Sequence, residues 1–309
     1  MKYETMKKLQ VMMTSSYQIT LILFFIVIVI RNVSAQTAVI FGASGAVGSE
    51  LLKSLLSDDS FEEAIVVGRQ SSSKKIDGII SFADAGKTKV TRVNLARVED
   101  ISTYTSIERA DACLIALGAS APHLDNLQQW HSVEIDLIRA IAEFCNKIQV
   151  RSISLLSAVD VENESAVPFT KEEIISYGEG ALGWIKMIQL YNRVKGLEEK
   201  AVIESASGVQ YIRLFQPSTI VTEQPRYGWF DVSLFRLHKL VDPYIPVQYH
   251  SVDVRLLGAA MVADAKRTLK GEEDFGSRQD VAKLTYENYV SVAGKVFQES
   301  LGATTKDEL

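Results

Sequence analysis

The stretch 37–56, "TAVIFGASGAVGSELLKSLL", decides the fold class of this chain. It opens with a short apolar run, TAVIFG, of the kind that forms a buried strand. Its second half, VGSELLKSLL, carries apolar residues at helical spacing. Gly42, which ends the first run, Gly45, and Gly48, which lies at the start of the second, are spaced three residues apart. The stretch therefore predicts a strand, a glycine-rich turn and a helix in direct succession.

Three glycines at this spacing meet the demands of a turn that holds a pyrophosphate. One residue must tolerate a positive φ, the backbone must be bare enough for the phosphates to approach, and a small residue must stand where helix crosses strand. The helix N-terminus adds free N–H groups and a positive dipole. Because the pattern lies in the first strand-to-helix turn, it predicts a dinucleotide site; the alternative is a purely structural turn.

Strands and helices continue to alternate along the chain. Further strands are predicted at 63–68, 89–93, 112–118, 150–157 and 209–215, with a long helix over 127–147. This alternation predicts an α/β fold of the Rossmann type, with a doubly wound parallel sheet. Beyond residue 216, helical stretches at 253–267 and 285–297 predict a small C-terminal helical lobe over the carboxyl edge of the sheet.

The type of dinucleotide is indicated by the residue that follows the second strand. NAD sites place an acidic residue there for the ribose 2′-hydroxyl, whereas NADP sites tend to place an arginine. The sequence has Arg69 at this point and no acid before Asp77. NADP(H) is therefore predicted, with NAD(H) disfavoured, and Ser71 or Lys74 could assist Arg69 at the 2′-phosphate. The alternative is a solvated surface arginine.

A pair with chemical potential follows in "YNRVK", where Tyr191 and Lys195 lie one helical turn apart. On one helix face, the ammonium favours the phenolate and lowers a tyrosine pKa near 10. Tyr191 is then a candidate acid for protonating a carbonyl oxygen. Alternatively, Tyr191 belongs to an apolar helical stripe and is core. Ser157, at the carboxyl end of the strand 150–157, stands at the sheet edge where ligands bind.

Taken together, these motifs resemble the extended or atypical short-chain dehydrogenase/reductases, over roughly residues 37–265. Within them, the chain is most similar to the branch of the Tat-interacting tumour suppressor oxidoreductase and NmrA-like proteins. The resemblance implies that Tyr191 is the acid/base, that Lys195 touches the nicotinamide ribose, and that Ser157 steadies the substrate carbonyl. It also implies a set of cofactor-binding positions: Gly42, Ser44, Gly45, Val47, Gly48 and Arg69 for the phosphates, and Leu117, Gly118, Lys195 and Pro217 near the ribose and nicotinamide.

Two features depart from that branch. The stretch 158–190 separates Ser157 from Tyr191 by more residues than close relatives have, which leaves Ser154 as an alternative serine. Gln216 stands before Pro217 where the branch usually has arginine.

Three functions compete on these observations. The first is an NADPH-dependent oxidoreductase that reduces a small carbonyl substrate by hydride transfer, with Tyr191 as general acid. The second is a catalytically quiet NADPH-binding protein that acts as a redox-sensing regulator or scaffold. The third is a nucleotide-sugar-modifying enzyme, which the short C-terminal portion disfavours. The Ser157, Tyr191 and Lys195 triad favours the first.

Composition narrows the range of partners. A net charge of −5 offers no basic face for phosphates, so no nucleic-acid partner is expected. Cys113 and Cys145 are too few for a disulfide scaffold, and their apolar surroundings favour two buried thiols; pairing them would need Cα atoms within about 7 Å. Their spacing to the histidines matches no metal motif, so no metal site is expected.

Both ends of the chain carry targeting-like sequences. A basic flank, an apolar run and a small-residue site ending at Ala35 predict a signal peptide over 1–35, or an uncleaved anchor that would be the chain's only attachment to a membrane. Residues 306–309, KDEL, match an endoplasmic reticulum retention signal, which predicts the reticulum lumen as location and the KDEL receptor as a partner.

The domain prediction follows: a targeting segment over 1–35, an NAD(P)-binding domain with its C-terminal lobe over 36–305, and the retention signal. If the chain is luminal, the sequon at Asn163 is a predicted glycosylation site in a surface loop.

Overall fold

The structure, a computed structural model, describes residues 36–82, 88–118, 131–161, 170, 183–222, 240–271 and 279–294. All of them belong to the unit Gln36–Leu309. The predicted targeting segment, the glycosylation site Asn163 and the retention signal lie outside the described residues. Within the described ranges, no helix combines the length and apolar composition that a membrane crossing requires.

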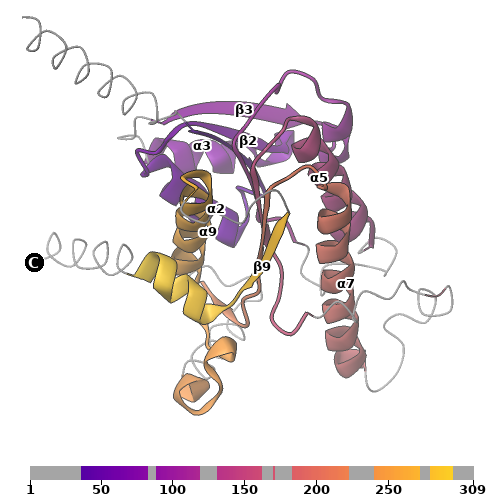
Figure 1. The fold of residues 1–309 in the computed structure, drawn as a ribbon, viewed down its shortest axis with the longest axis vertical. Helices are drawn as coiled ribbons and strands as arrows, with labels where there is room; N and C mark the ends of the chain where they lie inside the picture. Colours follow the sequence, from indigo (N-terminus) through magenta and orange to yellow (C-terminus); the bar gives the residue numbers. More distant parts are fainter. Residues whose placement is uncertain are drawn as a thin grey trace, which may run out of the picture. The chain divides into compact units, whose positions relative to one another are not determined.

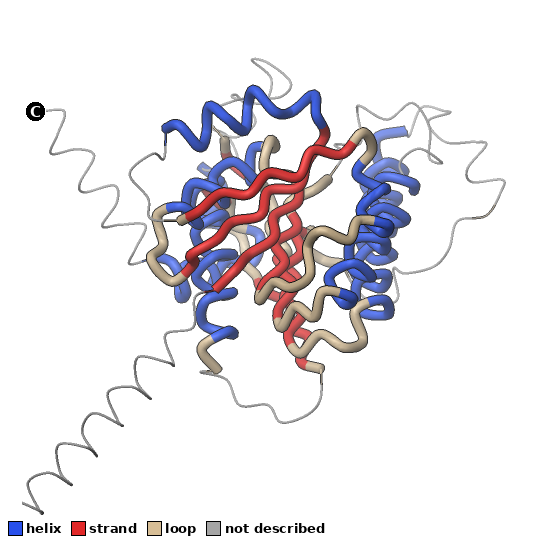
Figure 2. Tube along the Cα trace, turned by 90° about the horizontal axis from the view of Figure 1, so that it is seen from above, coloured by secondary structure: helices blue, strands red, loops and turns tan. Residues whose placement is uncertain are grey.

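A seven-stranded parallel sheet forms the centre of this unit (Figures 1 and 2). Its strands are β1 (Gln36–Phe41), β2 (Phe61–Arg69), β3 (Lys89–Leu95), β4 (Ala112–Ile115), β5 (Ser152–Leu156), β6 (Tyr211–Phe215) and β9 (Asp280–Leu284). The order β3-β2-β1-β4-β5-β6-β9 is the Rossmann order with one strand added after β6. The prediction of a doubly wound α/β fold is therefore confirmed, and the crevice where the strand order reverses lies between β1 and β4.

Helices cover both faces of the sheet (Figure 1). One face carries α2 (Ala46–Leu56), α3 (Ser73–Phe82) and α9 (Val254–Leu269); the other carries α5 (Leu137–Lys147) and α7 (Gly183–Ser205). Short helical turns complete the connections: η1 (Gln70–Ser72), η2 (Val98–Thr103), the π-helical η4 (Ser132–Asp136), η6 (Asp242–Tyr244) and η7 (Val247–Tyr249). In β1, Ala38 and Ile40 face α2 and α9, whereas Val39 and Phe41 face α5, because successive side chains of a strand alternate.

The predicted C-terminal lobe needs correction. The stretch 253–267 is helical as predicted, but as α9 it packs on α2 within the Rossmann unit. The two helices approach so closely that a Cβ on Gly258 would lie 2.7 Å from the backbone nitrogen of Leu51. The helical stretch 286–294 is also part of this core, since Tyr289 stacks on Phe215 with ring centroids 5.7 Å apart.

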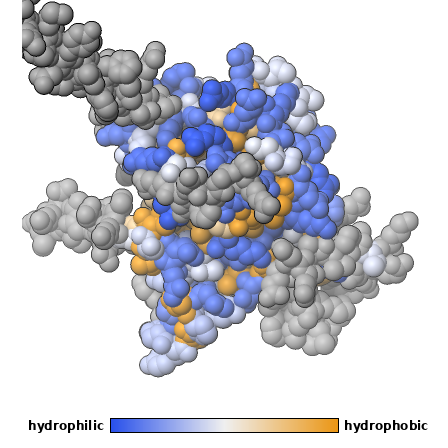
Figure 3. Space-filling view, in the orientation of Figure 1, coloured by the Kyte–Doolittle hydropathy of each residue, from blue (hydrophilic) through white to orange (hydrophobic). Residues whose placement is uncertain are grey.

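The segment 240–250, which precedes β8 (Val252–Asp253) and α9, contains no buried residue. Tyr244 is 87% exposed and Leu240 71% exposed. The short strands β7 (Ile220–Val221) and β8 pair in parallel beside it. The molecular face drawn in Figure 3 is largely hydrophilic, with small apolar patches between the charged residues.

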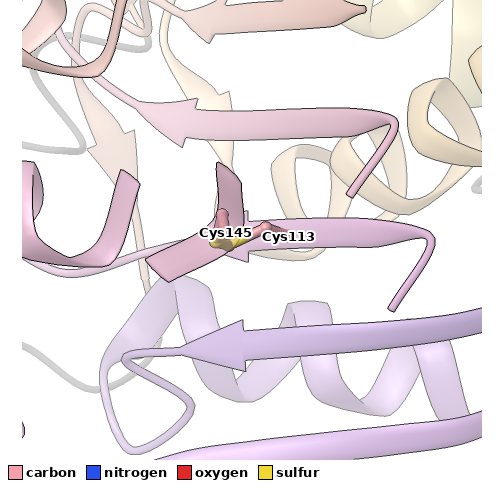
Figure 4. Close-up of a disulfide and its surroundings, with 2 residues drawn as sticks. All are labelled: Cys113 and Cys145. Carbon is pink, nitrogen blue, oxygen red and sulfur yellow. A yellow bond between two sulfur atoms is a disulfide. The ribbon is translucent and has the colours of Figure 1, made fainter. Parts of the chain in front are cut away.

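Cys113 of β4 and Cys145 of α5 form a disulfide (Figure 4). Their Cα atoms are 6.5 Å apart, within the limit stated above, and both residues are fully buried. The expected burial is confirmed, but the expectation of two separate thiols is wrong. The residues meet because Cys113 points from β4 toward the face that α5 covers, a contact between positions 32 apart in the sequence.

Candidate active site

The glycine-rich turn lies at the carboxyl end of β1, beside β4. Gly42 has φ +86°, a conformation that side chains other than glycine rarely adopt. A Cβ on Gly42 would lie 2.5 Å from the carbonyl oxygen of Ala116, so the turn also packs tightly against the end of β4. The Gly45 N–H donates to the Gly42 carbonyl at 2.9 Å, and Gly45 is the N-cap of α2.

Gly48 sits in the first turn of α2, directly over Gly42. A Cβ on Gly48 would lie 2.0 Å from the Gly42 carbonyl oxygen, so only glycine fits where helix crosses turn. No acidic side chain occupies the first turn of α2, which leaves its positive end open to an anion. Ser44 is half-buried in the turn and Val47 is buried beneath it. The structure thus brings together all five predicted residues of the phosphate-binding turn.

Arg69 is the last residue of β2 and is exposed, at the same sheet edge as the turn. It has no partner among the described residues. Asp77, the first acid after β2, lies within α3 and pairs with Arg92. Ser71 and Lys74 are exposed near the start of α3. The end of β2 and the start of α3 therefore present the cations Arg69 and Lys74 and the hydroxyl of Ser71. They present no unpaired carboxylate that could accept a hydrogen bond from a ribose 2′-hydroxyl.

Lys195 of α7 lies in a buried position close to the end of β4. Its Nζ donates to Oε2 of Glu134 and to Oε2 of Glu198, each at 2.7 Å. A Cβ on Gly118 would lie 3.8 Å from that Nζ and 3.7 Å from Glu134 Oε1. Gly118 itself is exposed and the preceding Leu117 is half-buried. The predicted proximity of Lys195 to the end of β4 is thus present in the structure.

Glu134 reaches Lys195 from the π-helical turn η4. A π-helical turn inserts an extra residue into a helix and is frequent at functional sites. Glu134 and Lys195 are 1% and 3% exposed, although 61 residues separate them in the sequence. The buried ammonium is thereby held from two elements, η4 and α7.

Charge and burial compete at these side chains. Burial alone would lower the pKa of Lys195, but its interactions with neighbouring acids, Glu134 first and then Glu198, outweigh burial and hold that pKa well above its ordinary value. Burial raises the pKa of Glu198 well above its ordinary value, against the opposing effect of Lys195. Lys195 is therefore an ammonium at neutral pH.

Tyr191 lies one turn before Lys195 on α7 and is half-buried, not a core residue. A negative Tyr191 side chain contributes to the raised pKa of Lys195, so the phenol and ammonium feel each other's charge. The predicted pair is brought together, at the same sheet edge as the glycine turn.

Ser157 is held in a second buried network next to the first. Its hydroxyl donates to Glu199 Oε1 at 2.5 Å, and Gln216 Nε2 donates to the same oxygen at 2.8 Å. Gln216 Nε2 also donates to the Val161 carbonyl at 3.2 Å, and so does Lys283 Nζ at 2.6 Å. Burial raises the pKa of Glu199 above its ordinary value. The Ser157 proton is thus directed to a carboxyl group in this structure.

The alternative serine, Ser154, lies on the wrong face of the sheet. It stands beside Arg213 in register, and Arg213 contacts Asp264 of α9. The α9 face is opposite the one that α7 covers. Pro217, by contrast, is buried next to the site, and its carbonyl accepts the Val159 N–H at 3.0 Å.

Sequence reasoning missed the residues that surround the triad: Glu134, Glu198, Glu199 and Lys283. Glu198 and Glu199 stand three and four residues after Lys195 on one helix, a spacing that signals contact with the lysine turn. Gln216 departs from the branch that the sequence resembles, which usually has arginine at this position. Its side-chain amide donates a hydrogen bond to Glu199. Among the described residues, no group of histidine, cysteine, aspartate and glutamate side chains is arranged to hold a metal ion.

Comparison with known proteins agrees with this geometry. A family model described as NAD(P)H-binding matches residues 42–227. The chain belongs to the NAD(P)H-binding family. No curated protein sequence matches the chain.

Solved structures with this fold include reductases. Gre2 from Candida albicans, in complex with NADPH, is 13% identical with a TM-score of 0.55, over 81% of this chain and 78% of that one. A short-chain dehydrogenase/reductase from Serratia marcescens is 12% identical with a TM-score of 0.54, over 82% and 98%. The yeast methylglyoxal/isovaleraldehyde reductase Gre2 with NADPH is 12% identical with a TM-score of 0.52, over 81% and 78%.

These findings establish an NAD(P)H-binding domain with a Rossmann-type fold, which the solved reductases named above share. The residues of the site fit a nicotinamide dinucleotide. Gly42 and Gly48 have no side chain that would keep a pyrophosphate from the backbone, and no acidic side chain lies in the first turn of α2 to repel it. The narrower branch suggested by the sequence remains a prediction.

Proposed function

We propose that the protein is an NADPH-dependent reductase of a small carbonyl compound, with Tyr191 as general acid. One observation carries the proposal: Lys195 of α7, one helical turn after Tyr191, lies close to Gly118 at the sheet edge that also holds the glycine turn. A dinucleotide that extends from that turn across the β1–β4 crevice has its far end near Lys195. The carbonyl to be reduced would then be next to the Tyr191 hydroxyl.

Bound NADPH supplies the hydride that reduces the carbonyl carbon. Tyr191 donates its hydroxyl proton to the carbonyl oxygen as negative charge develops there. Lys195 stabilises the phenolate that remains and offers an N–H to a ribose hydroxyl. Ser157 anchors the end of β5 by donating a hydrogen bond to Glu199. While its hydroxyl hydrogen is engaged in that bond, the Ser157 oxygen can still accept a hydrogen bond from another group.

Arg69 supports the preference for NADPH. The arginine is exposed at the end of β2, has no partner in the described part of the chain, and faces no competing acid there. A guanidinium binds a 2′-phosphate with charge-assisted hydrogen bonds, which NADH cannot accept.

The test is turnover by the purified protein with NADPH and a panel of aldehydes and ketones, followed by NADPH absorbance. The variant Tyr191→Phe removes only the hydroxyl, and Tyr244→Phe is the matched control because Tyr244 is highly exposed. We expect Tyr191→Phe to lower kcat by about 10²-fold or more, within the range general acids contribute, and the control to match the wild type. Equal turnover by Tyr191→Phe and wild type would remove Tyr191 from the mechanism.

A second candidate is a catalytically quiet NADPH-binding regulator. The observation in its favour is the hydrogen bond that the Ser157 hydroxyl donates to Glu199. A hydroxyl engaged in that bond does not donate to a substrate carbonyl. The same assay separates the two functions, since tight NADPH binding without turnover of any carbonyl supports the regulator.

We also propose that the protein works in the lumen of the endoplasmic reticulum. The tetrapeptide 306–309 and the apolar N-terminal run motivate this location, and the Cys113–Cys145 disulfide supports it because disulfides persist in oxidising compartments. Deletion of 306–309 should move the expressed protein to the culture medium, with a glycan at Asn163 removable by a glycosidase. A cytosolic, unglycosylated full-length protein would refute the proposed location.

A further inference from the structure

Two carboxyl groups and one ammonium form a buried cluster at the end of β4. We call Glu134, Lys195 and Glu198 the acid–lysine cluster; they are 1%, 3% and 0% exposed. The Lys195 Nζ lies 2.7 Å from an oxygen of each carboxyl group. If both carboxyl groups were ionised, the cluster would carry a net charge of −1 at a site that water does not reach.

An uncompensated buried charge is costly, and a buried acid usually avoids the cost by taking up a proton. Two carboxylates that share one site cannot both ionise easily, so the affinity of one of them for a proton rises. A single proton brings the acid–lysine cluster to neutrality. The geometry alone therefore favours one neutral carboxyl group.

Glu198 is the better of the two acids to hold that proton. Its Oε1 is buried and has no hydrogen-bond partner within the described ranges, so an ionised Oε1 would lack any donor to stabilise it. Glu198 is also followed by Glu199, a further carboxyl group whose charge acts on it. Glu134, by contrast, has an additional interaction in the structure and stands on a separate element.

We propose that Glu198 is a protonated, neutral carboxylic acid in the folded protein, so that the acid–lysine cluster presents no net negative charge to Tyr191. In this state Lys195 is an ammonium. It donates one hydrogen bond to the carbonyl oxygen of the Glu198 acid and one to the Glu134 carboxylate. The consequence for Tyr191 rests on the proposed reductase function. A cluster with two ionised acids would cancel the effect by which Lys195 favours the phenolate.

The groups that face Glu198 support this charge state. The charged groups that act most strongly on Glu198 are Lys195, which contacts it, Glu134 across the Lys195 ammonium, and Glu199 on the same helix. Lys283 of β9 lies 3.8 Å from Glu199 and so offsets that carboxyl group, not Glu198. Burial raises the pKa of Glu198, and Glu134 and Glu199 act in the same direction.

The charge state has a consequence for stability that differs from that of an ordinary ion pair. A carboxyl group whose folded pKa is raised stabilises the fold below its unfolded pKa, and this stabilisation is lost as the pH rises through the folded pKa. Glu198→Gln mimics the neutral acid at every pH. The variant should therefore match the wild type near pH 5 and unfold at a higher denaturant concentration than the wild type near pH 9.

Infrared spectroscopy tests the proton directly. A protonated carboxyl group has a C=O band separate from that of a carboxylate, and we expect this band in the wild type near pH 7. It should lose the intensity of one group in Glu198→Gln. Glu134→Gln should lose the same intensity, because Glu198 then ionises to pair with Lys195. Glu204→Gln, an exposed acid on the same helix, should leave the band unchanged.

A third measurement addresses Tyr191. The tyrosinate absorbance of each protein is titrated and the same titration of its Tyr191→Phe counterpart is subtracted. Where the wild-type carboxyl band persists up to the pH at which Tyr191 titrates, a neutral cluster predicts the same Tyr191 titration in wild type, Glu198→Gln and Glu134→Gln. A doubly ionised cluster predicts a lower Tyr191 pKa in both variants, since each removes an excess negative charge.

The proposal is overturned if Glu198→Gln leaves the wild-type carboxyl band intact, or if the stability of Glu198→Gln relative to the wild type does not increase as the pH rises. Should the variants fail to fold, the wild-type band and its loss at high pH decide the question alone. None of these measurements uses NADPH or a substrate. A failed reductase assay would thus leave the charge state standing, and a missing carboxyl band would leave the reductase proposal standing.

Discussion

The contact between α2 and the glycine turn gives the sharpest prediction about the fold. In Gly48→Ala, the added Cβ would lie 2.0 Å from the Gly42 carbonyl oxygen and 2.6 Å from its carbon. Both are backbone atoms, so no side chain can rotate away. Relief requires α2 to move by about 1 Å, because carbon–oxygen contacts normally lie near 3.3 Å or beyond.

The magnitude follows from two opposing effects. Forcing a methyl group into a packed site costs about 3 kcal/mol at the upper end of the usual range. Alanine gains about 1 kcal/mol over glycine within a helix. Gly48→Ala should therefore lower the free energy of unfolding by about 2 kcal/mol. With a urea m-value of about 3 kcal/mol/M, the unfolding midpoint falls by roughly 0.7 M.

The assay is urea unfolding followed by far-UV circular dichroism, with NADPH binding measured on the same samples. Gly78→Ala is the control, since Gly78 is in α3 with nothing within 4 Å of an added Cβ. That change should stabilise the protein by up to about 1 kcal/mol. A stable Gly48→Ala variant with unchanged NADPH affinity would refute the close approach of α2 to the turn.

Three further predictions address the cofactor, the disulfide and the second acid network. Arg69→Gln should weaken NADPH binding by about tenfold or more and leave NADH binding unchanged in fluorescence titrations, because only NADPH loses a charge-assisted contact of at least about 1.4 kcal/mol; an equal loss for both would place Arg69 away from the 2′-phosphate. Cys113→Ala should lower the free energy of unfolding by about 2–4 kcal/mol, and reductant should bring the wild type to the same value; a wild type insensitive to reductant would contradict it. Glu199→Gln should flatten the pH dependence of stability, because burial raises the pKa of Glu199 and its stabilisation is lost as the pH rises through that folded pKa; an unchanged slope would show that folding does not shift the pKa of Glu199.

Local signals explain which parts of the fold were predictable. The glycines of the β1–α2 turn, the apolar runs of β1, β4 and β6, and the spacing of Tyr191 and Lys195 are all readable within a few residues. The start of α9 is equally local, since Asp253 caps it by accepting the Arg255 N–H at 2.8 Å. Each of these features is set by backbone geometry or by periodicity.

Tertiary contacts account for what was missed. β9 alternates half-buried and exposed residues at the sheet edge and buries only Leu284, so it lacks the apolar run that marks the central strands. The periodicity of α9 indicates a helix but not the surface that buries it, and hence the lobe was misplaced. Glu134 and Cys145 join partners far away in the sequence, through a π-helical turn and a strand face that no local pattern encodes.

The central claim is that one NADPH molecule joins the glycine turn to the Tyr191–Lys195 pair. A crystal structure of the chain with NADPH tests it most directly. We predict the 2′-phosphate at Arg69, the pyrophosphate at the N-terminus of α2, and the nicotinamide ribose within hydrogen-bonding distance of Lys195. A cofactor whose nicotinamide lies away from Lys195 and Tyr191 would contradict the account.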